Sequence, residues 1–163
     1  MSKKKKTSDN TPDAMSPTIR NKKARFQFQL LEKLEAGLAL TGTEVKSLRQ
    51  GKASLEEAYA RIINGELFLV GCTISEYDHG NMQNHVPNRT RKLLVHRREI
   101  AKLEGKLVQK GLTLVPVRIY FTRGLAKIEI ALARGQTHAD KRQTLKRRQM
   151  DRDVERAVRR YKE

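Results

Sequence analysis

The amino-acid sequence predicts a mainly β protein: a small closed antiparallel β-barrel with two or three short helices and a basic, flexible arm at each end. Short apolar or alternating segments, separated by turn signals, fill the middle of the chain, which is typical of antiparallel strands. Only two segments of that middle part carry clear helix signals. A closed barrel is favoured over a sandwich because closure leaves no strand edge exposed.

The positive charge divides the 163 residues into three parts. Residues 1–25 carry eight basic and two acidic residues, and residues 134–163 carry 11 basic and five acidic ones, so these flanks hold +12 of the net +17. Nearly all large apolar residues lie between them. We therefore expect a disordered basic arm over residues 1–18, a barrel domain over 19–134 and a basic C-terminal arm over 135–163.

The first elements follow from local patterns. Phe26–Leu30 alternates apolar and polar residues, which predicts a half-buried strand, and Leu38–Leu40 predicts a short apolar strand. Thr41 followed by Glu44 matches a capping box and predicts a short helix that Gly51 ends.

Two hairpins account for most of the remaining barrel. Asn64-Gly65 and Arg123-Gly124 suit tight turns, and each pair separates two strand-like runs. The four runs are Tyr59–Ile63, Leu67–Ile74, Leu112–Phe121 and Leu125–Leu132. Between the hairpins we expect a polar loop over 75–90, a strand at Leu93–Val95, and a helix with Ile100, Leu103, Leu107 and Val108 on one face, ended by Gly111.

The C-terminal arm has a different character. From Asp140 onward it contains no Gly or Pro and is rich in helix formers, but its apolar stripe is thin. Its positive charge opposes an isolated helix. We expect it to be unfolded alone and helical when it lies against RNA.

Membrane, secreted and catalytic classes find little support. The longest apolar run, Leu67–Val70, is far short of the about 20 residues of a membrane span, and no apolar segment follows the N-terminal lysines. Cys72 is the only cysteine and lies in an apolar strand pattern, so a buried thiol in a cytoplasmic protein is expected. The four histidines show no metal-site spacing, and there is no glycine-rich phosphate loop. We predict no enzyme activity, no metal and no cofactor.

RNA binding fits the composition better. Basic residues gather in three clusters: Arg20, Lys22, Lys23 and Arg25; Arg89, Arg91, Lys92, Arg97 and Arg98; and Lys141, Arg142, Lys146, Arg147 and Arg148. Such clusters contact phosphates. Aromatic residues make up only 5% of the chain, which favours structured RNA over stacked single strands.

Four strings add specificity: NKKAR at 21–25, EAGLALTGTEVKSLR at 35–49, TRKLLVHRREI at 90–100 and GQTHADKR at 135–142. In order and separation they resemble the signature segments of the SsrA-binding protein (small protein B) family, over about residues 20–148. The resemblance implies an oligonucleotide-binding-like barrel. It also implies binding to the tRNA-like domain of tmRNA (SsrA RNA) and delivery of that RNA to stalled 70S ribosomes in trans-translation. The protein would stand in for the anticodon arm of a tRNA, and its C-terminal tail would sense the empty mRNA channel.

The resemblance also implies two sets of site residues. Those expected to contact tmRNA are Lys22, Lys23, Arg25, Glu35, Arg91, Lys92, Leu94 and His96. Those expected at the decoding centre and in the mRNA channel, against small-subunit ribosomal RNA, are Gly135, His138, Asp140, Lys141, Arg142, Lys146, Arg147 and Arg148.

Individual roles remain open between alternatives. Glu35 would accept hydrogen bonds from a base amino edge or hold an arginine, or it is an ordinary exposed strand residue. Leu94 would contact RNA or pack in the core, and His96 would stack on a base or sugar or simply start a helix. Family members commonly carry a histidine and an acidic residue where this chain has Phe26 and Gln27, so Phe26 is expected to pack or to stack on RNA.

Two other functions compete with this interpretation. Composition alone is equally typical of a generic ribosomal RNA-binding protein with basic tails. An RNA-processing enzyme would use His96 or His138 as acid or base, which requires a converging partner. A monomer suits a protein that acts within one ribosomal site.

Overall fold

The fold is an antiparallel barrel closed by six strands. The computed structural model describes residues 15–109 and 111–162, so most of the expected disordered arm, residues 1–14, lies outside the described part. The strands are β1 (Ile19–Arg20), β2 (Phe28–Leu38), β3 (Ala53–Ser54), β4 (Tyr59–Ile63), β5 (Glu66–Val70), β6 (Thr73–Ile74), β7 (Arg91–Leu94), β8 (Leu112–Thr122) and β9 (Leu125–Gly135). The helices are α1 (Ala24–Gln27), α2 (Gly42–Arg49), α3 (Arg97–Leu107) and α4 (His138–Lys162), with a 3-10 turn, η1 (Asn81–Gln83).

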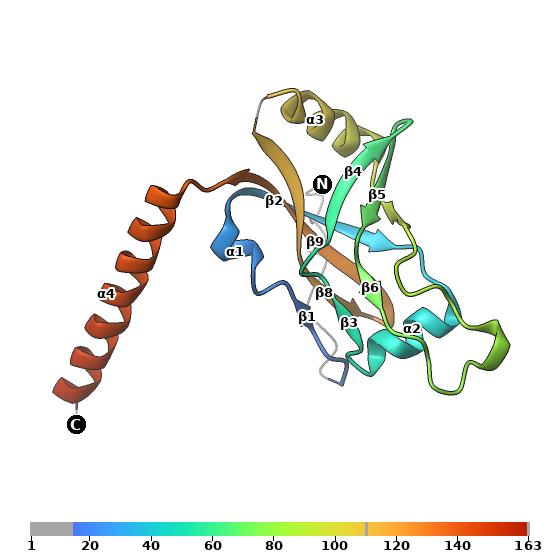
Figure 1. Ribbon diagram of the computed structural model, residues 1–163, viewed down its shortest axis with the longest axis horizontal. Helices are drawn as coiled ribbons and strands as arrows, with labels where there is room; N and C mark the ends of the chain where they lie inside the picture. Colours follow the sequence, from blue (N-terminus) through green and yellow to red (C-terminus); the bar gives the residue numbers. More distant parts are fainter. Residues whose placement is uncertain (1–14, 110, 163) are drawn as a thin grey trace, which may run out of the picture.

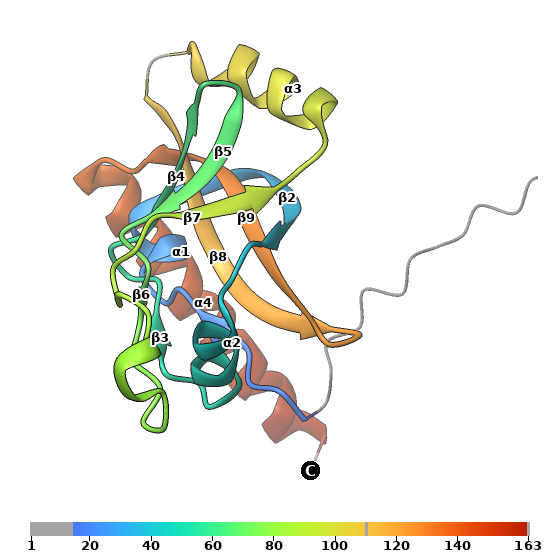
Figure 2. The same cartoon turned by 90° about the vertical axis from the view of Figure 1, so that its right-hand side faces the viewer.

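The ring runs β8–β4–β5–β7–β2–β9 and closes because β9 pairs back with β8 (Figures 1 and 2). Every pairing in it is antiparallel. β1 extends the sheet beside β8, and β3 and β6 form a separate pair. The predicted closed antiparallel barrel with short helices is confirmed.

Two helices cover the two ends of the barrel. Figure 1 shows α3 at one end and α2 at the other. Leu103 of α3 and Leu48 of α2 both belong to the buried core. Glu32 of β2 also accepts hydrogen bonds from Lys102 and Lys106, which ties α3 to the barrel wall.

The prediction of a strand at Phe26–Leu30 was wrong at its start. Asn21 is buried; its side-chain Oδ1 accepts from Ala24 N at 3.1 Å, and its Nδ2 donates to the carbonyls of Leu55 and Pro116. These bonds favour the short helix α1 at this point, which leaves Phe26 42% exposed.

One continuous strand, β2, begins at Phe28 and ends at Leu38. It takes in most of the strand predicted at 26–30, whereas of the strand predicted at 38–40 it contains only Leu38, so that prediction was wrong for Ala39 and Leu40. An irregularity in its pairing with β9 between Leu30 and Glu32 shifts which side chains face inward. A bulge of this kind breaks the alternation on which a sequence pattern depends, so the middle of β2 did not look like a strand.

Both predicted hairpin turns are confirmed. Asn64 and Gly65 have φ angles of 51° and 73°, and Arg123 and Gly124 have 52° and 75°, as a two-residue primed turn requires. The strand predicted to reach Ile74 stops at Val70. Gly71 has a φ of 74°, and a Cβ there would lie 2.6 Å from the carbonyl oxygen of Glu57, so the chain bends and continues as β6.

The helix predictions hold in most details. Thr41 N donates to Glu44 Oε2 at 2.8 Å, as the capping box requires. Ile100 and Leu103 face the core from α3, but Val108 lies just beyond that helix and is 83% exposed, so its place on the buried face was wrong. The arm is helical as α4. That the free arm is unfolded stays a prediction.

A buried ion pair joins α2 to β7 and to the loop before it. The Glu44 and Arg91 side chains are fully buried; Arg91 Nε donates to Glu44 Oε1 at 2.9 Å. Its other nitrogens donate to the carbonyls of Cys72, Arg89 and Pro87. Arg91 was expected to contact RNA; because its guanidinium is enclosed in the core, we assign it a structural role instead.

Arg91→Met should lower the free energy of unfolding by about 3 kcal/mol, because a buried carboxylate and three carbonyls lose a donor. Arg89 also bonds to Glu44 Oε2, at 2.7 Å, but its side chain is 37% exposed. Arg89→Met is therefore the matched control, with an expected loss of about 1 kcal/mol. Urea unfolding of both variants measures the difference. Equal losses would contradict the assignment of Arg91.

The stability of the protein should depend on pH through Glu44. Burial alone would raise the pKa of this carboxyl, but hydrogen bonds from Arg89 and Thr41 and the charge of Arg91 hold the pKa below its ordinary value. The stabilisation is therefore complete above the unfolded pKa of about 4.3 and is lost as the pH falls through the lower folded value. Urea unfolding between pH 5 and pH 2 measures this dependence. The Glu44→Gln variant should have a lower free energy of unfolding than the wild type at pH 5, and that free energy should fall less steeply with falling pH. If the two proteins lose stability in parallel, Glu44 is excluded as the cause.

Candidate nucleic-acid interface

The outer wall of the barrel carries two ordered rows of side chains. β7, β2, β9 and β8 run side by side in the ring (Figure 2). Their register aligns Leu94, Gly37, Lys127 and Tyr120 in one row. The neighbouring row contains Glu35, Glu129, Arg118 and, from β1, Arg20. We call these two rows the outer face.

Glu35 is held in a defined position on this face. The hydroxyl of Tyr120 donates to Glu35 Oε2, and Lys127 Nζ lies 3.7 Å from Glu35 Oε1. The Glu35 side chain is 27% exposed, so a bound molecule can still reach it. Glu35 therefore has two partners on the sheet that fix the position of its carboxylate.

The other carboxylate of the outer face is paired with two cations. Glu129 lies 2.9 Å from Lys33 Nζ and 2.9 Å from Arg118 Nη2, and its side chain is only 13% exposed. Burial would raise the pKa of Glu129, but the hydrogen bonds from Lys33 and Arg118 hold it below its ordinary value. The guanidinium of Arg118 also stacks 4.8 Å from the centre of the Tyr120 ring.

A basic depression of about 330 Å³ adjoins these residues. Its charged lining comes from β1, the β1–α1 turn, α1, β2, β8 and β9: Arg20, Lys22, Arg25, Lys33, Arg118 and Glu129. Lys33 and Arg118 are paired with Glu129, whereas Arg20, Lys22 and Arg25 form no ion pair with any residue in the described ranges. The depression therefore has a net positive charge and suits a phosphate group.

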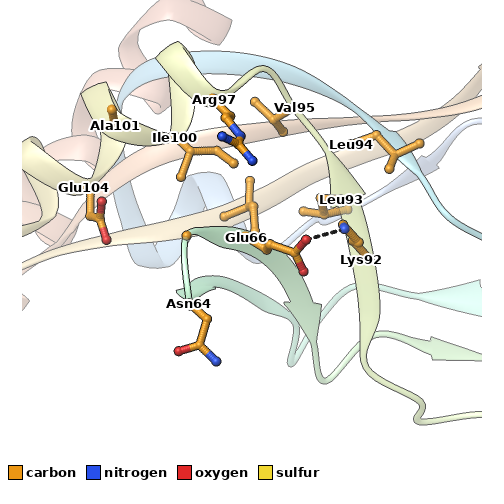
Figure 3. Close-up of a pocket in the computed structure, with 12 residues that line it drawn as sticks. Asn64, Glu66, Lys92, Leu93, Leu94, Val95, Arg97, Ile100, Ala101 and Glu104 are labelled. Carbon is orange, nitrogen blue, oxygen red and sulfur yellow. Dashed lines mark hydrogen bonds and ion pairs between the residues drawn. The ribbon is translucent and has the colours of Figure 1, made fainter.

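Two of the predicted contacts have other partners. Lys23 lies 2.9 Å from Glu56 and 3.7 Å from Glu57, and these hydrogen bonds and charges raise its pKa. Lys92 pairs with Glu66 in an open pocket of about 620 Å³ between β5, β7 and α3 (Figure 3). Both lysines are exposed, but neither lines the basic depression.

Leu94 and His96 are both accessible. Leu94 is 54% exposed, so the alternative that placed it in the core was wrong. It packs over Gly37, where an added Cβ would lie 3.2 Å from the Leu94 Cβ. His96 starts α3, because its backbone N–H donates to Glu99 Oε2, and its ring stays exposed. The helix-start role is thus established, and the exposed ring leaves stacking on RNA open.

The C-terminal set begins where β9 ends. Gly135 pairs with Phe28, and Thr137 and Asp140 hydrogen-bond to each other at the start of α4, which lowers the pKa of Asp140. Along α4, exposed basic side chains include Arg142, Lys146, Arg147 and Arg148. The side chains of His138 and Lys141 lie outside the described part of the structure.

Other site chemistry finds no support. Within residues 15–109 and 111–162, no group of three or more His, Cys, Asp or Glu side chains is placed to hold a metal ion. None of the helices described is long and apolar enough to cross a membrane. Burial raises the pKa of the Cys72 thiol to about 11, so the predicted buried thiol is confirmed and it is a poor nucleophile.

Sequence patterns did not predict four residues of this surface: Lys33, Arg118, Tyr120 and Lys127. They placed Arg20 in a basic cluster but did not predict that it lines a pocket. The alternation of Lys127 and Glu129 with Ile128 and Ile130 did indicate which side chains point outward. It could not indicate which residues of β2 and β8 lie opposite, because register is a property of the closed sheet.

The SmpB protein family model matches residues 18–160 of the chain. The chain belongs to the SmpB family. Among its relatives, the SsrA-binding protein of Pelotomaculum thermopropionicum is 51% identical over 145 residues, which cover 89% of this chain and 95% of the relative. The SsrA-binding protein of Acaryochloris marina is 55% identical over 141 residues, covering 86% and 92%.

Comparison with solved structures also finds a similar fold in an SmpB chain. A chain from a solved structure described as tmRNA-SmpB at the centre of the bacterial ribosome has a TM-score of 0.65 and 46% identity, covering 80% of this chain and 95% of that chain. The predicted resemblance to the SsrA-binding protein family is thereby confirmed.

Lys22 and Lys23 are adjacent in sequence but should differ in RNA binding. Lys22→Ala should weaken binding to a structured RNA and reduce the slope of log affinity against log salt by about 0.7 to 0.9, as expected for one lost phosphate contact. Lys23→Ala removes the same charge but from a residue already paired with Glu56, so its effect on the slope should be much smaller. Filter binding across a salt series measures both. Equal slopes for the two variants would show that only net charge matters.

Proposed function

We propose that this chain binds the tRNA-like domain of tmRNA and delivers it to stalled ribosomes for rescue by trans-translation. Membership of the SmpB family supports this proposal, as do relatives named SsrA-binding protein and the tmRNA-SmpB structure. The observation from this chain that carries it is the outer face, where a fixed, accessible carboxylate, Glu35, lies beside a basic depression.

The two parts of the surface would do different work. Lys22, Arg25 and their neighbours in the depression neutralise backbone phosphates, which gives affinity for any RNA. Glu35 accepts hydrogen bonds, and in a folded RNA the donors it meets are base amino groups or 2′-hydroxyls. Leu94 adds apolar contact next to it, and the ring of His96 and the side chains of Lys92 and Lys23 border the same RNA. Phosphate contacts thus position the RNA, and Glu35 selects it.

The C-terminal arm would act on the ribosome. With the barrel in the position of a tRNA anticodon arm, Gly135, His138, Asp140, Lys141 and Arg142 meet small-subunit ribosomal RNA at the decoding centre. Lys146, Arg147, Arg148 and the rest of α4 then enter the vacant mRNA channel. α4 suits this role because it is a long helix with exposed basic residues and no buried apolar face among its described side chains.

In this role the chain is a monomeric, non-enzymatic adaptor of the cytoplasm, where ribosomes and tmRNA meet. A generic ribosomal RNA-binding protein would share the charge and the helical arm. It would not need a carboxylate held on the RNA-binding face, because a carboxylate repels phosphates. The fixed position of Glu35 therefore favours the tmRNA adaptor.

The full-length chain should bind the tRNA-like domain of tmRNA more tightly than an ordinary tRNA of similar length at every salt concentration. Both affinities should fall with salt, by about 0.7 to 0.9 in log–log slope for each phosphate contacted. The preference should persist in high salt because it depends on hydrogen bonds to Glu35 rather than on net charge. Fluorescence anisotropy with both RNAs over a salt series measures it.

A chain that ends at Thr137 is the control for the arm. It should retain the preference for tmRNA while losing ribosome rescue in a reconstituted translation assay. Equal binding of the two RNAs by the full-length chain would replace the tmRNA proposal with the generic ribosomal one.

A further inference from the structure

The hydroxyl of Tyr120 has a single partner on the outer face, the carboxylate of Glu35. We propose that Tyr120 is a positioning residue that fixes Glu35 and thereby sets the preference of the outer face for tmRNA over other folded RNAs. The inference deepens the proposed function and rests on it. It assigns Tyr120 no RNA contact of its own, since that side chain is only 3% exposed.

Tyr120 is itself rigidly held. It sits near the end of β8, where Lys127 of β9 lies opposite, and the Arg118 guanidinium lies 4.8 Å from the centre of its ring. Burial and the hydrogen bond to Glu35 raise the pKa of Tyr120, so the phenol stays protonated and always donates. Glu35 Oε2 is therefore always the acceptor of this bond.

The bond determines what the rest of the carboxylate can do. With Oε2 engaged, Oε1 remains 3.7 Å from Lys127 Nζ, longer than a good hydrogen bond. Oε1 thus keeps acceptor capacity for a donor from RNA. A carboxylate that is already ordered also loses less conformational entropy when RNA binds.

Without the hydroxyl, Glu35 has a competing partner. It would be free to rotate toward Lys127 and form a close ion pair. That closer pair would occupy the acceptor that base or ribose groups need. Tyr120 therefore holds Glu35 Oε1 at 3.7 Å from Lys127 Nζ and prevents a closer pair.

Gly37 leaves space for this arrangement. It occupies the row of Leu94, Lys127 and Tyr120, directly between Leu94 and Lys127. An added Cβ would press against Leu94 at 3.2 Å. The absence of a side chain at this point lets Leu94 pack over β2, in the row next to Glu35.

The test is Tyr120→Phe, which retains the ring and its packing and removes only the hydroxyl. Affinity for the tRNA-like domain of tmRNA should fall about five- to twentyfold, the range expected when one ordered charge-assisted hydrogen bond is lost. Affinity for tRNA should change less than about twofold, and the salt slopes for both RNAs should stay the same because no phosphate contact is removed. Tyr59→Phe, which removes a hydroxyl from the exposed tyrosine of β4, is the matched control and should change neither affinity.

A double-mutant cycle separates positioning from stability. If Tyr120 acts through Glu35, Tyr120→Phe should have no further effect on the preference for tmRNA in a Glu35→Ala background. Additive losses in the cycle would overturn the inference, as would a Tyr120→Phe variant that only lowers the unfolding midpoint and keeps the preference. If the wild-type chain shows no preference for tmRNA over tRNA, the proposed function and this inference both fail. If the wild-type chain shows that preference and the Tyr120→Phe variant retains it, the inference alone fails.

Discussion

Closure of the barrel depends on β2, the strand that pairs with β7 along one edge and with β9 along the other. A closed ring fixes the register of every strand, because a shift of one residue would turn every core side chain outward. Leu34, Ala36 and Leu38 of β2 therefore face the core or pack against it, and Glu35 and Gly37 face outward. The alignment of Glu35 with Glu129 and Arg118 follows from that register, and the residues around Glu35 in the sequence do not determine it.

Carboxylates in a strongly basic RNA-binding protein require an explanation, because each one opposes the field that attracts phosphates. In this chain the three that bear most on structure and site are all held by donors. Glu44 is bonded to Arg89 and Arg91 in the core, Glu129 to Lys33 and Arg118 at the edge of the basic depression, and Glu35 to Tyr120. Glu35 is hydrogen-bonded to a neutral side chain, and Lys127 Nζ lies 3.7 Å from it, farther than the cations paired with Glu44 and Glu129. That difference singles out Glu35 as the acceptor for RNA.

The sequence predicted the barrel, both hairpin turns and the two helices at its ends, because the glycine turns, the Thr41 capping box, the apolar helix face after Ile100 and the alternating strands are local signals. It failed where distant contacts decide. The bonds from Asn21 to Leu55 and Pro116 convert the start of a predicted strand into α1, and the irregularity after Leu30 hides the middle of β2. Arg91 illustrates the same limit for the site. Arg91 belongs to a cluster of basic residues in the sequence. In the strand, however, side chains alternate, so Lys92 and Leu94 are exposed while Arg91 and Leu93 are buried. Glu35 and Leu94 could be placed by family resemblance, whereas Tyr120 could be placed only by the register.

The segment from Arg20 to Gln27 connects the RNA-binding wall to the C-terminal arm. Its side chains line the basic depression, while its backbone holds the arm: Gln136 N donates to the carbonyl of Gln27 at 3.2 Å, and Arg148 Nη2 donates to the carbonyl of Arg25 at 3.1 Å. The guanidinium of Arg25 thus lines the basic depression, and its backbone carbonyl accepts the hydrogen bond from Arg148. Because the two groups are separate, a phosphate that neutralises the Arg25 side chain does not compete with Arg148 for the backbone. The barrel can therefore hold tmRNA while α4 keeps its direction, which is the geometry an adaptor needs if one end carries an RNA and the other enters the ribosome.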